Sequence, residues 1–200
     1  MTETEIKLRW HGTAEEAQAL IERQGYTLST PRTLEADQLF DLLSGGLRQS
    51  DQLLRLRKTN SPLGNARAMV TYKGPATREV YKSREEIEFD VSDPDAFVLV
   101  LQRLGYRPSF RYEKYRTQLI AAGEPGLIAI DETPIGVFLE LEGEKEWIDS
   151  TATLLGFPVT QFVTASYAAL YKEYQTQNGN SPVDMTFGLG SPYESGPKLP

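Results

Sequence analysis

The stretch ETEIKL at residues 3–8 carries a charged side chain at every second position. Side chains alternate between the two faces of a β-strand, so a strand here turns Glu3, Glu5 and Lys7 to one face. The apolar side chains of the same stretch then lie on the opposite face. The stretch therefore predicts a strand that holds two carboxylates and an ammonium group side by side above a hydrophobic core.

The same period of two recurs in four later segments. Their charged members are Arg55 and Arg57; Arg84, Glu86, Glu88 and Asp90; Lys114 and Arg116; and Glu140 and Glu142. The opposite faces carry the apolar pairs Ile6/Leu8, Leu54/Leu56, Ile87/Phe89 and Leu139/Leu141. A solvated face is the ordinary explanation for one such strand, but five of them indicate a sheet that curls into a barrel. Helices would then cover the apolar faces from outside, and the charges would meet inside.

The sequence predicts helices that could form this outer layer. Thr13-Ala-Glu-Glu16 has the spacing of a capping box and predicts a helix over 13–24. Asp93-Pro94 predicts a second helix that ends at Gly105. The remaining elements are expected as helices over 144–155 and 160–174, and as strands within 26–72 and at 112–120, 127–131 and 137–141. The fold class is therefore α+β, with more strands than helices.

A single domain is expected over residues 1–174. From residue 175 the sequence is dense in Gly, Pro, Ser and Asn and has no hydrophobic periodicity. Such a composition cannot bury enough apolar surface to offset its conformational entropy. A flexible C-terminal tail is expected over 175–200.

Composition excludes several classes of function. The chain of 200 residues has a net charge of -7, no cysteine and one histidine, His11. This balance argues against a general nucleic-acid surface, and a bound metal would be held mainly by carboxylates. No run approaches the roughly 18 apolar residues of a membrane span, and the acidic N-terminus differs from a secretory signal. We expect a cytoplasmic protein that binds neither membranes nor nucleic acid.

A barrel interior lined with both signs of charge is costly unless the ions are paired or bind a ligand. A triphosphate with a divalent cation meets that need. Arg and Lys contact phosphate oxygens, while carboxylates supply the oxygen ligands that Mg²⁺ or Mn²⁺ prefers.

The ordered motifs of the chain resemble the CYTH superfamily, the triphosphate tunnel metalloenzymes. The matching segments are ETEIK at 3–7, LRLRK at 54–58, TYKGP at 71–75, REEIEF at 84–89, KYR at 114–116, IDETPIGVFLELEG at 130–143 and SYAALY at 166–171. The resemblance extends from about residue 3 to residue 174. One departure is Leu-Phe-Asp-Leu at 39–42, where the family has Tyr-Phe-Asp-Thr.

This resemblance implies an eight-stranded antiparallel tunnel and assigns roles to its charged residues. The implied triphosphate contacts are Lys7, Arg55, Arg57, Lys73, Lys114 and Arg116. The implied metal ligands, for Mg²⁺ or Mn²⁺, are Glu3, Glu5, Glu140 and Glu142, with Glu86, Glu88 and Asp131 as further acidic candidates. Lys7, Glu5 and Lys73 are the candidates for direct participation in catalysis. Family relatives often form dimers, so a homodimer is one expected arrangement.

Two reactions use the same charged set. Hydrolysis releases phosphate from inorganic triphosphate, thiamine triphosphate or a nucleoside triphosphate, whereas a class IV adenylate cyclase makes cyclic AMP and pyrophosphate from ATP. Hydrolysis is the favoured reaction and the cyclase is the alternative. A non-catalytic binder of polyphosphate or nucleotide is a third hypothesis, and a purely structural barrel is a fourth.

Overall fold

The computed structural model describes residues 2–60, 66–180 and 184–188. Its strands are β1 (Thr2–Trp10), β2 (Thr27–Leu42), β3 (Leu53–Asn60), β4 (Ala66–Lys73), β5 (Thr77–Arg78), β6 (Lys82–Asp90), β7 (Tyr106–Ile120), β8 (Leu127–Thr133) and β9 (Gly136–Glu142). Its helices are α1 (Ala14–Arg23), α2 (Gly46–Gln49), α3 (Pro94–Arg103), α4 (Lys145–Leu154) and α5 (Tyr167–Gln177), with a 3₁₀ turn η1 at Val159–Gln161.

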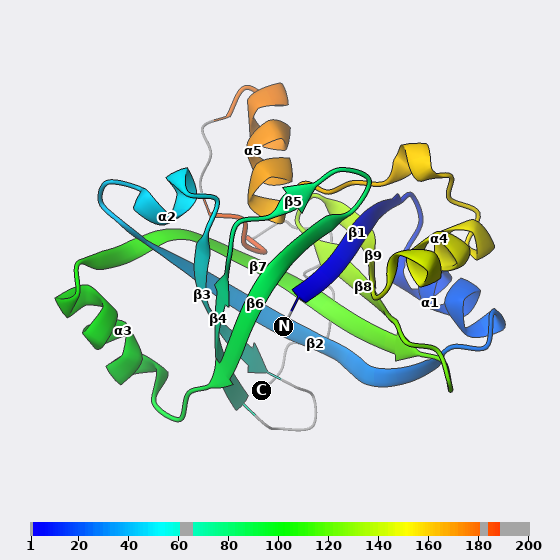
Figure 1. The fold of residues 1–200 in the computed structure, drawn as a ribbon, viewed down its shortest axis with the longest axis horizontal. Coiled ribbons are helices and arrows are strands. Elements are labelled where there is room, and N and C mark those ends of the chain that lie inside the picture. Colours follow the sequence, from blue (N-terminus) through cyan, green and yellow to red (C-terminus); the bar gives the residue numbers. More distant parts are fainter. Residues whose placement is uncertain (1, 61–65, 181–183, 189–200) are drawn as a thin grey trace.

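The sheet closes on itself as a barrel (Figure 1). Its strand order is β1-β9-β8-β7-β2-β3-β4-β6, and β1 also pairs with β6, so that eight strands form a ring. Every pairing is antiparallel, and the short β5 adds to β6 outside the ring. The expected eight-stranded barrel is therefore confirmed. In this order β2 lies four strands from β1 in both directions, so the two strands stand on opposite sides of the interior.

The register of β1 sets which side chains face inward. Glu5 lies opposite Glu142 and Lys7 lies opposite Glu140 on β9, while Glu5 lies opposite Lys82 on β6. Because side chains alternate along each strand, these charged residues share the inner face.

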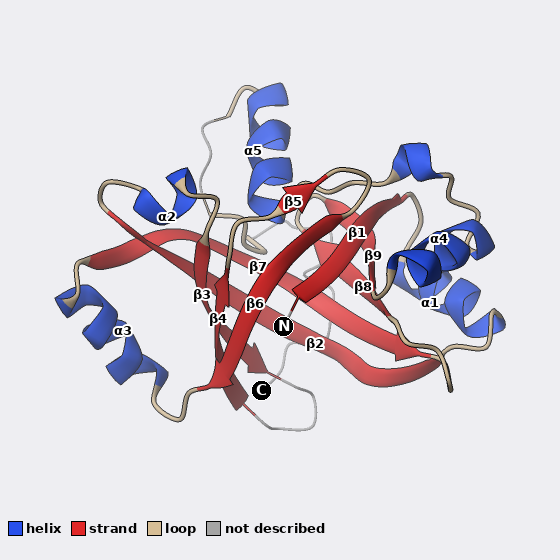
Figure 2. Cartoon of the chain, viewed as in Figure 1, coloured by secondary structure: helices blue, strands red, loops and turns tan. Residues whose placement is uncertain are grey.

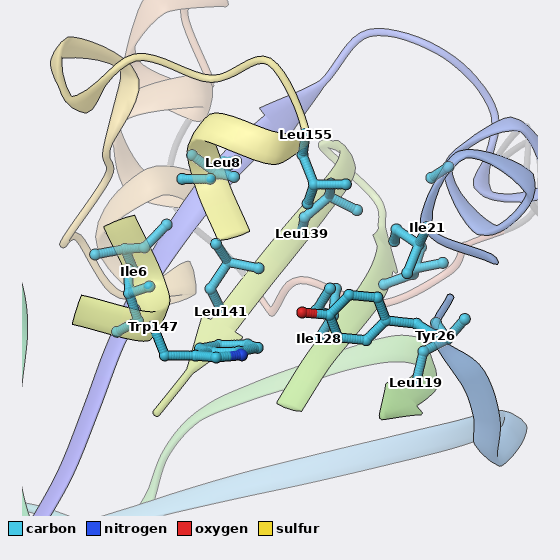
Figure 3. Packing of buried hydrophobic residues seen from close by; sticks show 14 of the residues in the cluster. Ile6, Leu8, Ile21, Tyr26, Leu119, Ile128, Leu139, Leu141, Trp147 and Leu155 are labelled. Carbon is cyan, nitrogen blue, oxygen red and sulfur yellow. The ribbon is translucent and has the colours of Figure 1, made fainter. Parts of the chain in front are cut away.

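The outward face of β1 and β9 forms the largest hydrophobic cluster, under α1 and α4. Ile6, Leu8, Leu139 and Leu141 have no exposed surface, and Figure 3 shows Leu141 beside the Trp147 ring of α4. Burying each such side chain contributes about 1.5–3 kcal/mol to stability. This packing confirms that β1 and β9 are charged inside and apolar outside.

One apolar pair is less covered than the sequence indicates. Ile87 and Phe89 on the outer face of β6 each keep 51% of their surface exposed. The ring of Phe89 contacts Phe97 of α3 edge to face at 6.5 Å, but Ile87 belongs to none of the buried clusters of the described residues. The expectation that helices cover this face was therefore wrong for Ile87. Helix α3 follows β6 in the chain and contacts Phe89, next to the last residue of the strand.

The first three long helices begin and end close to the expected residues (Figure 2). Thr13 and Glu16 form the reciprocal capping box of α1, and Asp93 caps α3 just before Pro94. The last expected helix differs, since α5 begins only at Tyr167. The intervening chain leaves the helical path because Val163 exchanges two 2.9 Å backbone hydrogen bonds with Lys7 of β1. Short α2 was not expected.

The region predicted to be a flexible tail contains ordered contacts in the described part. Helix α5 continues to Gln177, and Met185 is fully buried against β7, where it pairs with Tyr112. Residues 181–183 and 189–200 lie outside the described residues, as do residues 61–65 of an expected turn. The domain boundary at 174 remains a prediction.

Figure 1 shows α5 apart from α1 and α4. Its Tyr167 and Tyr171 pack with Tyr112, Phe138 and Met185 in a second cluster, on the side of the barrel where β7 begins. Within the described ranges, no helix has the length and apolar character needed to cross a membrane.

Candidate functional site

The barrel encloses a cavity of about 620 Å³, which we call the tunnel. Its charged lining residues are Glu3, Glu5, Lys7, Glu35, Arg55, Arg57, Arg67, Lys73, Lys82, Arg84, Glu86, Glu88, Lys114, Arg116, Glu140 and Glu142. All six predicted phosphate contacts are brought together here, and so are the predicted metal ligands other than Asp131. An interior with this density of charge suits polar ligands rather than apolar ones.

One wall of the tunnel consists of bases held by the acids of β2. Arg57 donates two hydrogen bonds to Asp37, from Nε at 2.8 Å and from Nη2 at 3.0 Å, and its Nη1 lies 2.9 Å from Glu35. Arg55 Nη2 donates to Thr71 at 2.8 Å and lies 3.3 Å from Glu88. These partners hold both guanidinium groups in place before any ligand arrives.

Asp131 holds a second pair of bases, Lys114 and Arg116, in position. It is fully buried and accepts hydrogen bonds from Lys114 Nζ at 2.7 Å and from Arg116 Nε at 2.6 Å. The Tyr167 hydroxyl of α5 also donates to it at 2.7 Å. Asp131 does not line the tunnel, so its position favours the support of two cations over the metal-binding role predicted for it.

Lys7 lies between two carboxylates, with Nζ 3.2 Å from Glu5 and 3.0 Å from Glu140. Burial would lower the pKa of Lys7, but Glu140 and Glu5 outweigh it and raise the pKa above its usual range. Lys7 thus stays charged at neutral pH, which suits a phosphate contact better than a general base. Glu5 also pairs with Lys82, and Glu140 with Arg116.

The two carboxylates beside Lys7, those of Glu5 and Glu140, have lowered pKa values. Burial would raise the pKa of Glu5, but Lys7 and Lys82 hold it well below its usual range. Burial opposes the ionised form of Glu140 too, yet Lys7 and then Arg116 keep its pKa well below the usual value. Both carboxylates are therefore ionised and already compensated by protein cations.

A second group of acids lacks that compensation. Burial is the largest cause, and a hydrogen bond with Glu86 the next largest, of the rise in the pKa of Glu3 to about 9. Lys73, whose Nζ lies 3.9 Å from Glu3, opposes this rise. Burial is also the largest cause of the raised pKa of Glu142. Buried carboxylates with too few cations nearby are disfavoured as anions, so a divalent cation would stabilise their ionised form.

The donor chemistry of this group fits a hard divalent cation, because Mg²⁺ and Mn²⁺ prefer carboxylate oxygens. In the part of the chain that the structure describes, no three acidic or histidine side chains are already arranged as a metal cage. The residues thus fit the metal in kind, because it would stabilise the anions of Glu3 and Glu142, and Glu86 is hydrogen-bonded to Glu3. Glu86 also pairs with Lys73.

Several tunnel residues were missed by sequence reasoning. Glu35 and Asp37 carry the same period of two as the motifs and were detectable in the stretch TLEAD at 33–37. Lys82 extends the alternation of Arg84 and Glu86 by one step. Tyr167 lies in the SYAALY motif at 166–171, but the sequence assigned it no role, since an aromatic residue at a helix start is usually part of a core.

A family model described as the CYTH domain matches residues 1–154. The chain belongs to the CYTH family. Members of this family bind triphosphate substrates, generally depend on divalent metals, and act as adenylate cyclases or triphosphatases.

A CYTH relative appears among curated proteins. A protein of Methanocaldococcus jannaschii that is provisionally named an adenylate cyclase is 33% identical over 116 residues, which cover 56% of this chain and 60% of the relative. The chain therefore matches about three-fifths of the length of that relative.

Solved structures share the CYTH fold. A protein of Pyrococcus horikoshii superimposes with a TM-score of 0.71 at 26% identity, over 86% of this chain and 99% of its own. A provisionally named adenylate cyclase of Vibrio parahaemolyticus gives 0.72 at 18% identity, over 85% and 97%. A similarly named protein from Hippeastrum, with a dominant triphosphatase activity, gives 0.61 at 18% identity, over 90% and 97%. The last two show the shared fold alone.

Proposed function

We propose that this CYTH protein is a divalent-metal-dependent triphosphatase that hydrolyses inorganic triphosphate or a small organic triphosphate in its tunnel. The observation that carries the proposal is the division of the lining into two walls. Fixed bases of β3 and β7 flank β2, and carboxylates gather on β1, β6 and β9 across the interior, among them Glu3 and Glu142, whose pKa values are raised by burial. A triphosphate with a divalent cation is the ligand that satisfies both walls.

The bases would bind and stabilise the phosphates. Arg55 and Arg57 on β3, with Lys114 and Arg116 on β7, offer donors to the phosphate oxygens, and Lys7 and Lys73 add charge from neighbouring walls. Their carboxylate partners hold them in position, so little reorganisation is needed as negative charge develops in the transition state.

Glu3, Glu86 and Glu142 would hold the metal, with Glu5, Glu88 and Glu140 as nearby acids of the same wall. A bound divalent cation would supply neutralisation of phosphate charge and a more acidic water nucleophile. Glu3 would then lose its proton, since a cation beside the carboxylate favours its ionised form.

A class IV adenylate cyclase is the second candidate, and the provisional name of the Methanocaldococcus jannaschii relative favours keeping it. The same phosphate contacts would serve attack of the ribose 3′-hydroxyl on the α-phosphorus, with pyrophosphate as the leaving group. The dominant triphosphatase activity of the Hippeastrum protein keeps hydrolysis first. A non-catalytic binder would gain little from so many carboxylates.

Phosphorus NMR of the products separates these functions. The purified protein, tagged at its C-terminus, is incubated with Mg²⁺ or Mn²⁺ and with tripolyphosphate, thiamine triphosphate or ATP in separate tubes. Orthophosphate release that is lost in Glu3→Gln and kept in the exposed Glu79→Gln supports the triphosphatase. Pyrophosphate with cyclic AMP would identify the cyclase, and binding without any product would leave a sensor.

A further inference from the structure

A short stretch beyond helix α5 pairs with β7 at an edge of that strand. Among the described residues, β8 pairs with β7 only at residues 115–119, so the earlier part of this edge has no β8 partner. Met185 takes that place. Its backbone N–H donates to the Arg111 carbonyl at 2.9 Å, and its carbonyl accepts from the Glu113 N–H at 2.8 Å. Because these two bonds lie on either side of Tyr112, they fix the backbone of β7 at that residue.

Side chains anchor the same stretch, residues 184–185, which we call the C-terminal segment. Asp184 Oδ1 accepts a hydrogen bond from the Arg111 backbone amide at 2.8 Å, and the Asp184 carbonyl accepts one from the Tyr171 hydroxyl of α5 at 3.3 Å. Met185 has no exposed surface and packs in one hydrophobic cluster with Tyr112. The C-terminal segment is therefore a part of the folded barrel wall.

Tyr112 connects this segment to the tunnel. It lies opposite Asp37 on β2, which lies opposite Arg57 on β3, so the three residues form one row across the inner face. Tyr112 lines the tunnel and its hydroxyl has a hydrogen bond with Arg55. Since a guanidinium group only donates, the Tyr112 oxygen is the acceptor. Burial, and after it Asp37, raises the pKa of Tyr112 to about 12, so the hydroxyl stays neutral.

The guanidinium of Arg55 depends on neutral partners for its orientation. Its Nε lies 3.5 Å from Asp37 and has no hydrogen-bond partner within the described part of the chain. Its second acid, Glu88, keeps 42% of its side chain exposed, so water screens that ion pair. The buried groups that hydrogen-bond to Arg55 are the hydroxyls of Thr71 and Tyr112. Two hydroxyls on different strands thus set the direction of its donors.

We propose that Tyr112 is a positioning residue for Arg55, and that the C-terminal segment fixes Tyr112 for this role. The proposal rests on the phosphate-binding role proposed above for Arg55. Without the Tyr112 hydroxyl, Arg55 keeps its charge but is free to turn, so it meets the phosphate oxygens less often in a productive orientation. A part of the chain beyond residue 174 then contributes to the tunnel.

Two variants with matched controls test this. Tyr112→Phe removes the hydroxyl and keeps the ring. Its control is Tyr115→Phe, on the same strand, because Tyr115 does not line the tunnel. Asp184→Ala removes the acceptor of the Arg111 amide and loosens the C-terminal segment. Its control is Glu173→Ala, which removes an exposed acid from α5.

Nitrogen-15 NMR of the ligand-free protein, labelled at arginine, tests the positioning without any substrate. A guanidinium held by several partners rotates slowly about its Nε–Cζ bond, and its two Nη groups then give separate signals. The Arg55 signals, identified by their loss in Arg55→Lys, should be separate in the parent and in both controls. They should merge in Tyr112→Phe and broaden in Asp184→Ala.

Merged Arg55 signals in the parent, or unchanged signals in Tyr112→Phe, would overturn the proposal. Unchanged signals in Asp184→Ala would overturn the role given to the C-terminal segment.

Calorimetry with tripolyphosphate and Mg²⁺, together with initial rates, measures the consequence for the site. For Tyr112→Phe we expect Kd to rise and kcat/KM to fall about tenfold each, as for the loss of one hydrogen bond to a charged group. In the Arg55→Lys background the same change should matter less than about twofold, because the group that it positions is gone. Tyr115→Phe should bind and react like the parent.

Equal effects of Tyr112→Phe in the two backgrounds would overturn the proposal while leaving the triphosphatase intact. If the parent binds no tripolyphosphate but its Arg55 signals respond as expected, the triphosphatase fails and the positioning of Arg55 by Tyr112 stands.

Discussion

The hydroxyl of Tyr167 donates a 2.7 Å hydrogen bond to Asp131, which joins helix α5 to the charged interior of the barrel. The ring of Tyr167 also lies 5.2 Å from Lys7 Nζ and 5.2 Å from Lys114 Nζ. One aromatic residue at the start of a helix thus contacts two lysines that we propose as phosphate contacts, and the acid that supports a third base, Arg116.

Asp131→Asn should destabilise the protein by about 3–5 kcal/mol, because it leaves Lys114 and Arg116 buried without their carboxylate. Tyr167→Phe removes one hydrogen bond to a charged group and should cost about 1.5–3 kcal/mol. Urea unfolding measures both. If Asp131→Asn were as stable as the parent but no longer bound Mn²⁺, Asp131 would be a metal ligand after all.

Arg57→Lys should lower kcat/KM by about two powers of ten, since an ammonium cannot reproduce the paired bonds to Asp37 or present the same fork to phosphate. The exposed Arg23→Lys on α1 serves as the control. Initial rates of phosphate release from tripolyphosphate provide the measurement. Full activity in Arg57→Lys would remove Arg57 from the proposed phosphate contacts.

Glu3 should make stability depend on pH. Its pKa is about 9 in the folded protein against an ordinary value of 4.5, so the folded state holds the proton more tightly than the unfolded state. This stabilisation is complete below about pH 4.5 and is lost as the pH rises toward about 9.

In buffer with EDTA, the Tm of the parent should therefore fall relative to that of Glu3→Gln between about pH 5 and pH 9. Glu79→Gln, an exposed change, should follow the parent. Parallel curves for the parent and Glu3→Gln would show that Glu3 has an ordinary pKa in solution.

Tripolyphosphate with Mg²⁺ should raise the Tm, because it binds preferentially to the folded state. At a ligand concentration of a hundred times Kd, this binding adds about 2.7 kcal/mol to the free energy of unfolding. EDTA should abolish most of the shift if the metal joins ligand and carboxylates. Differential scanning fluorimetry measures the shift. An unchanged melting curve would argue strongly against a tunnel that binds triphosphates.

Met185→Ala should lower the free energy of unfolding by about 2–5 kcal/mol, as expected for a large buried side chain. Met185 has no exposed surface and its backbone bonds to Arg111 and Glu113 of β7. The neighbouring Thr186→Ala is the control. Equal stability of the two variants would mean that the segment around Met185 detaches readily in solution.

The inner faces of the barrel were predictable because charge alternation is a local signal. The period of two in ETEIKL and in the segments around Arg55, Lys114 and Glu140 is visible without any knowledge of pairing. Which carboxylates are compensated was not predictable. Glu3 and Glu5 are indistinguishable in sequence, and only their partners across the barrel give them opposite pKa shifts.

The start of α5 depends on contacts between distant segments, and so does a second cavity of about 740 Å³, which shares Leu53, Arg84 and Ser166 with the tunnel. Val163 leaves the helical path because of backbone bonds to Lys7, a residue that no local pattern connects to it. The second cavity combines residues from α2, α5 and several strands, each ordinary in its own context.

The pairing of β1 also determines the order in which the protein can be assembled during synthesis. Glu5 is 77 residues from Lys82 along the chain, and its neighbour on β9, Glu142, is made later still. At about 5–20 residues per second, a ribosome leaves the first strand without either partner for several seconds. The strand that is synthesised first therefore completes the barrel among the last, and until then a nascent-chain chaperone would encounter it as a free edge.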